Sequence, residues 1–208
     1  MIAIIDYGVG NLLSVAKALE HIGSQAIVTS RKEDIQSADG VIVPGVGAFG
    51  DAMLSLRQRE LLDPVITHAQ SGKPLLGICL GMQLLFSESE EHGIHAGLDL
   101  IPGRVVRMQG TYKIPQVGWN QLQMERPHPV VEQVGEGEFA YFVHSYYAVP
   151  KDSSVIIATT DYHQAVPAIV AKDNVIGMQF HPEKSAATGL KLLTNFATWV
   201  RTGGGSSC

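Results

Sequence analysis

The stretch Gly77-Ile78-Cys79-Leu80-Gly81 follows an apolar run, Pro74–Leu76, and opens onto Met82–Phe86, where leucine and methionine continue. This pattern predicts a strand, a sharp turn with Cys79 at its apex, and a helix. Glycines two positions before and after the apex allow a tight bend and a close approach of neighbouring elements. The nucleophile elbow of hydrolases follows the same logic, with a serine oxygen where this chain has sulfur.

Two interpretations of Cys79 follow from this pattern. A thiol at a helix N-terminus lies near the positive end of the helix dipole and near free N–H groups, which favours the reactive thiolate. The alternative is a structural thiol buried between a strand and a helix, because free cysteine is among the most buried residue types. The choice depends on what else the chain can place beside the sulfur.

Strand and helix patterns alternate through the first half of the chain. The expected strands are Ile2–Ile5, Ala26–Thr29, Val41–Val43 and Leu75–Cys79, and the expected helices are Leu12–Ile22 with Asn11 as N-cap, Asp51–Gln70 with a break near Pro64, and one beginning with Met82–Phe86. This alternation predicts an α/β fold with a doubly wound, mostly parallel sheet flanked by helices. Sites in such sheets lie at the carboxyl ends of strands, where Asp6-Tyr7-Gly8, Pro44-Gly45 and Cys79 fall.

The second half of the chain has a different pattern. Closely spaced strands are expected at Arg104–Met108, Val117–Leu122, Phe139–His144, Ser154–Thr159, Ala168–Ala171 and Val175–Phe180, before an amphipathic helix at Thr188–Arg201. Antiparallel additions to the parallel sheet explain them. Because no internal repeat or linker divides the chain, we expect a single domain over residues 1–201 and a flexible Gly/Ser tail over 202–208.

Composition narrows the class of protein. The chain has 208 residues, 45% hydrophobic and 17% charged, with a formal net charge of -5, which is typical of a compact globular protein. Basic residues do not cluster, so we expect no nucleic-acid partner, and no apolar run is long enough to span a bilayer. The N-terminus reads as a first strand rather than a signal peptide. Only two cysteines, Cys79 and Cys208, argue against a disulfide framework and favour a reducing cytoplasm.

A cysteine nucleophile needs a base and a group that orients the base. His181-Pro182-Glu183 offers both at the end of the run Val175–Phe180. Residues two apart in an extended chain face the same side, so the carboxylate of Glu183 can hold the His181 imidazole while its other nitrogen faces the thiol. The alternative is a solvated loop after a strand.

The other histidines fit this chemistry less well. His92 and His95 lie in a polar loop beside Glu90 and Glu91, and without a further ligand cluster they are expected at the surface rather than at a metal. His144 ends a strand, and we expect it either to line a cleft or to be a hydrogen-bonded buried histidine.

Acyl chemistry on a thiolate also needs donors for the developing oxyanion. The elbow offers one N–H, from Leu80, and the glycines of Pro44-Gly45-Val46-Gly47 allow the Val46 or Gly47 peptide to offer a second. The same loop matches the dinucleotide fingerprint G-x-G-x-x-G at residues 45–50. Pro44 and the absence of an acid after the next strand argue against a nucleotide, and no cofactor is expected.

Taken together, these segments resemble the class I (triad) glutamine amidotransferases, and among them the glutaminase subunits of imidazole glycerol phosphate synthases. The resemblance extends to about Arg201 and rests on Asp6–Leu12 with Ser14-Val15, Pro44–Gly47, GICLGMQ at 77–83, PQVGWN at 115–120, YFVHSY at 141–146 and QFHPEK at 179–184. GICLG-Q and HPE mark the superfamily, whereas PGVG, GMQ and GWN are more selective for this subunit. The resemblance implies a flavodoxin-like class I amidotransferase architecture.

The resemblance also implies a set of residue functions. Cys79 attacks the side-chain amide of glutamine, His181 transfers protons, and Glu183 orients His181. The oxyanion hole is implied at Leu80, Val46 and Gly47, and glutamine binding at Gln83, Glu91, His144, Ser145 and Tyr146. Glu91 taken alone is one of several acids in a polar segment, so a solvated position is its alternative.

The family further implies a partner for the released ammonia. This is a (β/α)₈-barrel cyclase that forms a heterodimer with the glutaminase and makes imidazole glycerol phosphate and an aminoimidazole carboxamide ribotide in histidine biosynthesis. Residues expected to face it are Asn11, Trp119, Asn120, Tyr141 and Lys184. No metal is implied. For Trp119 the alternative is an ordinary core aromatic.

One departure and three alternatives remain. Many relatives carry histidine where this chain has Gln116, which keeps a hydrogen-bond donor but cannot titrate near neutral pH. A glutaminase of an anthranilate or aminodeoxychorismate synthase is the first alternative, although those chains usually carry PGPG. The others are a stand-alone cysteine hydrolase of the same fold and a catalytically silent binding domain, which the intact Cys79, His181 and Glu183 disfavour.

Overall fold

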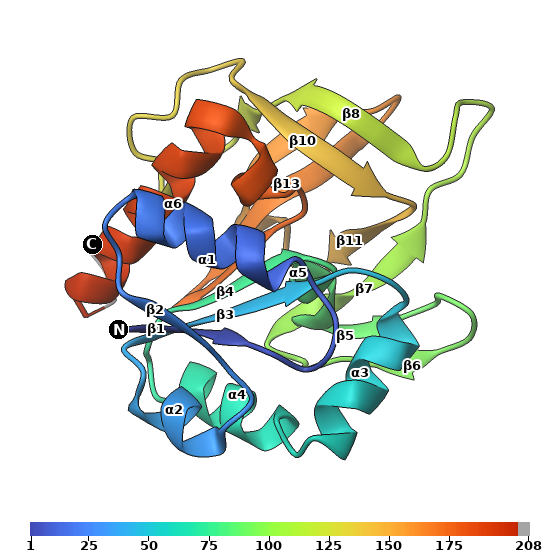
Figure 1. Ribbon diagram of the computed structural model, residues 1–208. Coiled ribbons are helices and arrows are strands. Elements are labelled where there is room, and N and C mark those ends of the chain that lie inside the picture. The colour runs from blue at the N-terminus through green and yellow to red at the C-terminus, as the bar shows by residue number, and fades with distance from the viewer. Residues whose placement is uncertain (204–208) are drawn as a thin grey trace.

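A computed structural model describes residues 1–203 and is built around one large mixed sheet (Figure 1). Its eight strands run in the order β2-β1-β3-β4-β14-β13-β12-β9. Their bounds are β1 Ile2–Ile5, β2 Ala26–Thr29, β3 Gly40–Gly45, β4 Leu75–Cys79, β9 Gln123–Met124, β12 Ile156–Asp161, β13 Ala165–Lys172 and β14 Val175–Met178. The first five strands of this order pair with their neighbours in parallel. The other three, β13, β12 and β9, are added through antiparallel pairings. The predicted parallel sheet with antiparallel additions is confirmed.

Helices cover both faces of the sheet. Helices α1 (Leu12–His21) and α6 (Ala186–Arg201) pack on one face, and α2 (Lys32–Ser37), α3 (Phe49–Gln58) and α4 (Leu62–Gln70) lie on the other (Figure 1). Alternate residues of β1 divide between the two cores: Ile2 and Ile4 join the first, while Ala3 and Ile5 join the second. This division is why the parallel strands read as continuous apolar runs rather than as alternating ones.

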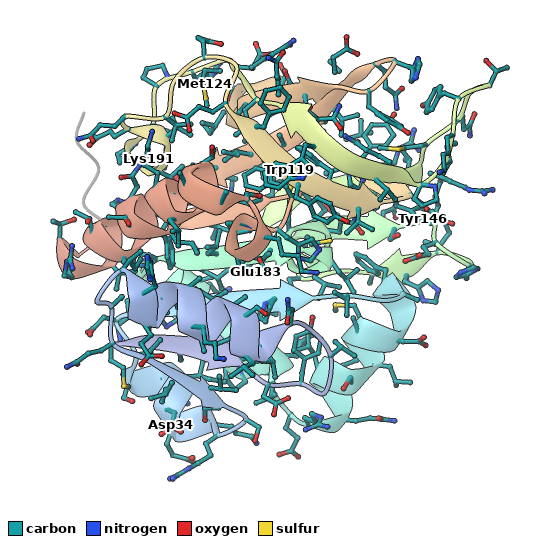
Figure 2. All side chains as sticks on the ribbon, turned by 45° about the horizontal axis from the view of Figure 1, so that its top comes forward. Asp34, Trp119, Met124, Tyr146, Glu183 and Lys191 are labelled. Atoms are coloured by element: carbon teal, nitrogen blue, oxygen red, sulfur yellow. The ribbon has the colours of Figure 1, made fainter. Side chains whose placement is uncertain are left out.

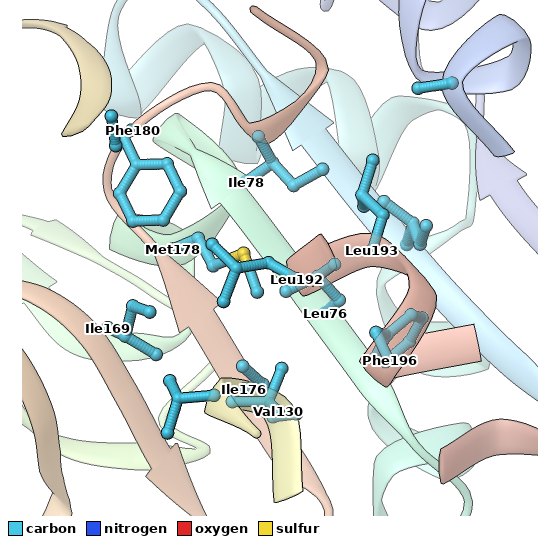
Figure 3. Packing of buried hydrophobic residues seen from close by; sticks show 14 of the residues in the cluster. Leu76, Ile78, Val130, Ile169, Ile176, Met178, Phe180, Leu192, Leu193 and Phe196 are labelled. Carbon is cyan, nitrogen blue, oxygen red and sulfur yellow. The ribbon is translucent and has the colours of Figure 1, made fainter. Parts of the chain in front are cut away.

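The first core fills the space between α6 and the middle of the sheet. Figure 3 shows side chains of two strands packed against α6, and all of them are buried. They are Leu76 and Ile78 of β4, Met178 of β14, and Leu192 and Leu193 of α6. The strand that ends at Cys79 is therefore held rigidly on both sides. A rigid strand end is what a catalytic side chain requires of its support.

Two smaller sheets come from the second half of the chain. Strands β8 (Gln116–Gln121) and β10 (Phe139–His144) form an antiparallel ribbon. Strands β11 (Tyr146–Pro150), β7 (Ile101–Arg107), β5 (Phe86–Ser89) and β6 (His95–Ala96) form a four-stranded sheet. Short 3₁₀ turns lie at η1 (Pro129–Val131), η2 (Ser153–Val155) and η3 (Pro182–Lys184).

The predicted helix from Met82 to Phe86 was wrong at its end. Helix α5 spans only Leu80–Leu84, and Phe86 begins strand β5 instead. The reason is tertiary, because the carbonyls of Leu84, Leu85 and Phe86 accept bonds from the backbone of residues 98–101. Strand β5 then pairs with β7 and β6, elements that lie later in the chain.

The expected helical break near Pro64 was also misplaced. The chain breaks at Glu60, where φ is +56°, and resumes as α4 two residues later. Pro64 lies in the first turn of α4, where its missing N–H needs no partner. Helix α2 was not predicted; it has six residues, of which only Ile35 is buried. Asn11 occupies the N-cap position of α1 as expected, but its side chain makes no capping hydrogen bond.

Among the described residues, no helix combines the length and the apolar character that a membrane span requires. The expected Gly/Ser tail, including Cys208, lies almost wholly outside the described residues.

Candidate active site

Cys79 stands at a strained turn between β4 and α5. Its backbone has φ +55° and ψ −111°, a conformation that L-residues rarely adopt and that costs of the order of 1–3 kcal/mol. Glycines make the turn possible: a Cβ on Gly77 would lie 2.5 Å from the Gly81 carbonyl oxygen, and one on Gly81 would lie 1.8 Å from the Val43 oxygen. The predicted elbow is present, and the two glycines are required by close backbone approach.

His181 and Glu183 reach the same end of the sheet from β14, the strand next to β4. The imidazole Nδ1 lies 2.8 Å from Glu183 Oε1, and the two side chains are 3% and 1% exposed. The predicted pair is present, but the two residues do not lie in an extended strand as expected. Strand β14 ends at Met178, and the 3₁₀ turn Pro182–Lys184 returns the carboxylate to the ring.

The electrostatics of His181 connect it with Cys79. Burial by itself lowers the pKa of the imidazole, but a hydrogen bond to the Cys79 sulfur, a second to Glu183 and the charges of both raise it to about 9. The sulfur and the carboxylate therefore both stabilise the protonated imidazole. A nucleophile, a base and an orienting acid in this order form the general arrangement of a catalytic triad.

The backbone around His181 is tied to the β8–β10 ribbon. Its N–H donates to the Tyr141 carbonyl oxygen at 3.0 Å. Ser185 closes the connection, because its hydroxyl donates to the His181 carbonyl at 2.7 Å and accepts from the Tyr141 N–H at 3.0 Å. The position of the imidazole is thus mechanically linked to strand β10.

A cavity of about 290 Å³ opens at the sulfur. It is lined by Val46, Gly47, Cys79, Leu80, Gln83, Glu91, Val143, His144, Ser145, Tyr146 and His181. The structure therefore brings together Cys79, His181 and every residue for which the sequence analysis expected oxyanion or glutamine binding. It adds Val143, whose carbonyl oxygen lies 4.0 Å from the sulfur.

Strand register explains how the glycine loop reaches this cavity. Gly45 pairs with Cys79 across β3 and β4, so Val46 and Gly47 emerge beside the elbow. Gly47 has φ +96° with open space around it, so its conformation rather than crowding calls for glycine. Tyr7, fully buried beneath the loop, donates its hydroxyl proton to the Pro44 carbonyl oxygen at 2.5 Å.

The remaining wall of the cavity is a hydrogen-bonded network around the Tyr146 carbonyl oxygen. Gln83 Nε2 donates to it at 2.8 Å and His144 Nδ1 at 2.9 Å. Burial lowers the pKa of His144 to about 4, so its ring is neutral at physiological pH. With its proton on Nδ1, His144 keeps a lone pair on Nε2, a buried atom with no partner among the described residues.

Gln179 also belongs to the site, although the sequence did not predict it there. Its side chain is fully buried and contacts both Gln83 and the Cys79 sulfur. The available signal was a lone amide inside the apolar run Val175–Phe180, at the start of the QFHPEK motif.

Glu91 lies at the rim of the cavity and is not a freely solvated acid. Its Oε2 accepts the backbone N–H of Phe49 at 2.7 Å, which caps the first turn of α3. A larger hollow of about 610 Å³ between α3 and β6 shares Glu91 with the cavity and is lined by His92 and His95.

The residues expected to face a partner are all at or near the surface. Trp119 on β8 is 50% exposed, which excludes a core position, and its ring lies 5.9 Å from that of Tyr141 on β10. Figure 2 shows Trp119 on this ribbon and Glu183 deeper in the molecule. Lys184 is exposed, whereas Asn11 and Asn120 are partly buried. The side-chain amide of Asn120 donates to the Asp161 carbonyl oxygen.

A family model for class-I glutamine amidotransferases matches residues 3–199. The chain belongs to this family. Curated relatives of this amidotransferase are named imidazole glycerol phosphate synthase subunit HisH. The one from Syntrophotalea carbinolica is 51% identical over 203 residues, covering 94% of this chain and 98% of that protein. The one from Geobacillus kaustophilus is 50% identical over 212 residues, covering 99% and 100%.

Solved structures agree with this amidotransferase in fold. A crystal structure of a glutamine amidotransferase superposes with a TM-score of 0.77 at 20% identity, covering 97% of this chain and all of that one. The structure of PurLQS from Thermotoga maritima gives a TM-score of 0.73 at 19% identity, with 95% and 97% covered. The α/β architecture with antiparallel additions is therefore that of the amidotransferases.

Proposed function

We propose that this chain is the glutaminase subunit of an imidazole glycerol phosphate synthase. It hydrolyses glutamine to glutamate and ammonia and delivers the ammonia to a cyclase partner in histidine biosynthesis. The observation that carries the chemistry is one cavity in which the Cys79 elbow, the His181–Glu183 pair and the glycine loop meet. The choice of synthase is supported by relatives at 50–52% identity over nearly the full chain.

In the first half of the reaction, the Cys79 thiolate attacks the side-chain carbonyl carbon of glutamine. A C–S bond forms, and the carbonyl electron pair moves to the oxygen, which becomes an oxyanion. When the tetrahedral intermediate collapses, the C–N bond breaks and the nitrogen takes a proton from His181. Ammonia leaves, and a glutamyl thioester remains on Cys79.

In the second half, water attacks the thioester carbon and gives its proton to His181. The C–S bond then breaks, the sulfur leaves as a thiolate, and glutamate is released. Glu183 keeps the imidazole in one orientation throughout and stabilises its protonated form. Protons and electrons balance with water as the only co-reactant.

The oxyanion needs donors in place before charge develops. The N–H of Leu80 at the start of α5 is one such donor, and the Val46–Gly47 peptide beside the elbow is the second. Removal of one donor of this kind typically costs about 10²–10³ in rate. The positive φ of Gly47 gives this peptide the freedom to turn its N–H toward the cavity.

The amino-acid end of glutamine carries an ammonium and a carboxylate. Acceptors available for the ammonium are the Glu91 carboxylate and the Gln83 side-chain oxygen, and donors for the carboxylate come from the backbone and hydroxyls of Ser145 and Tyr146. Charge-assisted hydrogen bonds of this type are among the strongest in proteins. They select a free amino acid over a peptide, which has neither charge at that position.

The β8–β10 ribbon is the surface we assign to the cyclase, for which we propose a (β/α)₈ barrel. Its outer face exposes Val117, Trp119, Phe139 and Val143 on adjacent strands, with Tyr141 partly buried among them. An apolar face rich in aromatic residues is typical of interface cores. Because Tyr141 bonds the backbone of His181, a partner on this ribbon would act directly on the triad. We place the complex in the cytoplasm, where Cys79 stays reduced.

The deciding experiment measures glutamate release from glutamine by the chain alone, with the cyclase subunit, and with the cyclase plus its phosphoribulosyl-formimino substrate. We expect low release alone and strong stimulation in the complete complex. Stimulation by a chorismate-using synthase instead would identify a different glutaminase. High activity without any partner would favour a stand-alone hydrolase, and no activity under any condition would contradict glutaminase function altogether.

The raised pKa of His181 predicts how activity depends on pH. Because ammonia leaves with a proton from the imidazolium, we expect kcat/KM of the complex to fall about tenfold per pH unit above a pH of about 9. The Glu183→Gln variant lacks one of the charges that raise this pKa, so its alkaline limb moves to lower pH. An alkaline limb that stays in place in the variant would contradict the assignment.

The raised pKa of His181 also makes the stability of the protein depend on pH. The pKa of His181 rises from 6.5 in the unfolded chain to about 9 in the folded one. Its contribution to the free energy of unfolding is therefore complete below pH 6.5 and is lost as the pH rises through about 9. Urea unfolding of wild type and of Glu183→Gln at pH 6 and pH 10 measures this difference.

A further inference from the structure

Gln179 lies between the nucleophile and the substrate wall of the cavity. Its side chain is fully buried directly after strand β14, the strand next to β4. The Gln179 Nε2 atom lies 4.0 Å from the Cys79 sulfur, and its Oε1 accepts a bond from Gln83 Nε2 at 3.0 Å. A buried amide among apolar side chains is costly unless both of its ends are bonded, so this placement calls for an explanation.

The direction of this amide chain is fixed at its far end. The Tyr146 carbonyl oxygen can only accept, so Gln83 must turn its nitrogen toward it, as the 2.8 Å contact shows. The second proton on the same nitrogen then points at Gln179, which must accept it with its side-chain oxygen. Gln179 is left with its nitrogen facing the Cys79 sulfur.

Two consequences follow from this ordering. The sulfur of Cys79 receives an N–H donor, which stabilises the thiolate over the thiol. Gln83 has both of its side-chain protons occupied, so the group that it can offer to a ligand in the cavity is its oxygen. An oxygen suits the ammonium of an amino acid and repels its carboxylate.

We propose that Gln179 is a positioning residue that couples the nucleophile to the substrate wall: it donates to the Cys79 sulfur and holds Gln83 with its oxygen toward the ligand. This proposal rests on the proposed glutaminase function for its substrate, but its action on the sulfur is independent of that function. His181 and Tyr7 are the titratable groups that interact with the same sulfur, and both stay unchanged in the variants below.

The test compares wild type with Gln179→Met, which keeps the length of the side chain and removes both hydrogen-bonding ends. The first readout is the second-order rate of Cys79 alkylation by iodoacetamide at pH 7.5, measured by mass spectrometry without substrate. We expect the rate to fall about tenfold, which corresponds to a loss of about 1.4 kcal/mol in the free energy that stabilises the thiolate over the thiol. Gln179→Asn, with an amide too short to span the gap, gives the same slowing if the methionine variant folds poorly.

The second readout is the split between KM and kcat in the complex with the cyclase. We expect Gln179→Met to raise KM for glutamine about tenfold, because Gln83 is released to rotate. Gln83→Met raises KM by a similar factor. In the double variant we expect KM to rise less than about threefold beyond its value in either single variant, because both substitutions interrupt the same series of hydrogen bonds.

Gln116→Met is the matched control. Gln116 is equally buried, but its amide donates to Asn120 at 3.1 Å and makes no bond to Cys79 or Gln83. It should change the melting temperature without changing the alkylation rate.

Unchanged alkylation in both Gln179 variants, or KM effects that multiply fully in the double variant, would overturn the proposal. If wild type releases no glutamate while Gln179→Met still slows alkylation, the glutaminase assignment fails and the action on the sulfur stands.

Discussion

Replacement of Cys79 by alanine is expected to lower glutamine hydrolysis in the complex by at least about 10⁴-fold. The thiolate is the atom that forms the covalent intermediate, and loss of a triad nucleophile typically removes most of the catalytic acceleration. Glutamate release under saturating glutamine measures the loss. Circular dichroism should show an unchanged fold, because the Cys79 side chain is small and lies at the edge of the core.

The stability of two Cys79 variants provides an internal control on the strained turn. At φ +55° alanine retains the strain, whereas glycine relieves it. We therefore expect Cys79→Gly to be more stable than Cys79→Ala by about 1 kcal/mol, although both are inactive. This reverses the usual order for a buried position, and a less stable glycine variant would show that the turn carries no strain.

The largest expected effect on stability belongs to Gly81→Ala. The added methyl group would lie 1.8 Å from the Val43 carbonyl oxygen, and a backbone atom in the middle of the sheet cannot move aside. We expect a loss of about 4 kcal/mol or more in the free energy of unfolding, or failure to fold. Chemical denaturation of purified protein measures the loss.

Gly135→Ala is the matched control for this substitution. Its added methyl group meets only the Glu138 side chain at 3.5 Å, an ordinary contact distance, so we expect a change within about 0.5 kcal/mol. A Gly81→Ala protein of near wild-type stability would mean that α5 can shift away from β3. The elbow would then be a softer structure than the contacts indicate.

The parallel part of the fold was predictable because its signals are local. Strands β1, β2 and β4 were predicted with the bounds that they have in the structure, since each is a short apolar run between turn residues. Strands β5, β6, β9 and β11 were not predicted. Their hydrogen-bond partners lie elsewhere in the chain, and residues 86–89 contain a single apolar side chain, Phe86, which gives no local signal of a strand.

The candidate site was predictable to a different degree for each residue. The role of Cys79 could be predicted from its flanking glycines, which are a local signal. The role of the HPE motif could be predicted only from the resemblance, because its residues form a 3₁₀ turn and not the extended chain that was expected. Glu91 was expected to bind glutamine, which stays a prediction, and the structure shows that its carboxylate caps α3. Gln179 was quoted only as part of a motif, because nothing local tells a bonded buried amide from an unpaired one.

The sequence by itself determined the α/β class, the elbow at Cys79 and the family, because these depend on residue order within short segments. Only the tertiary structure decided which groups meet at the sulfur. His181, Gln179 and the Val46–Gly47 loop come from segments 32 to 102 positions away from Cys79, and the register of β3, β4 and β14 sets their distances. Register depends on the packing of both cores at once, which is a property of the whole chain.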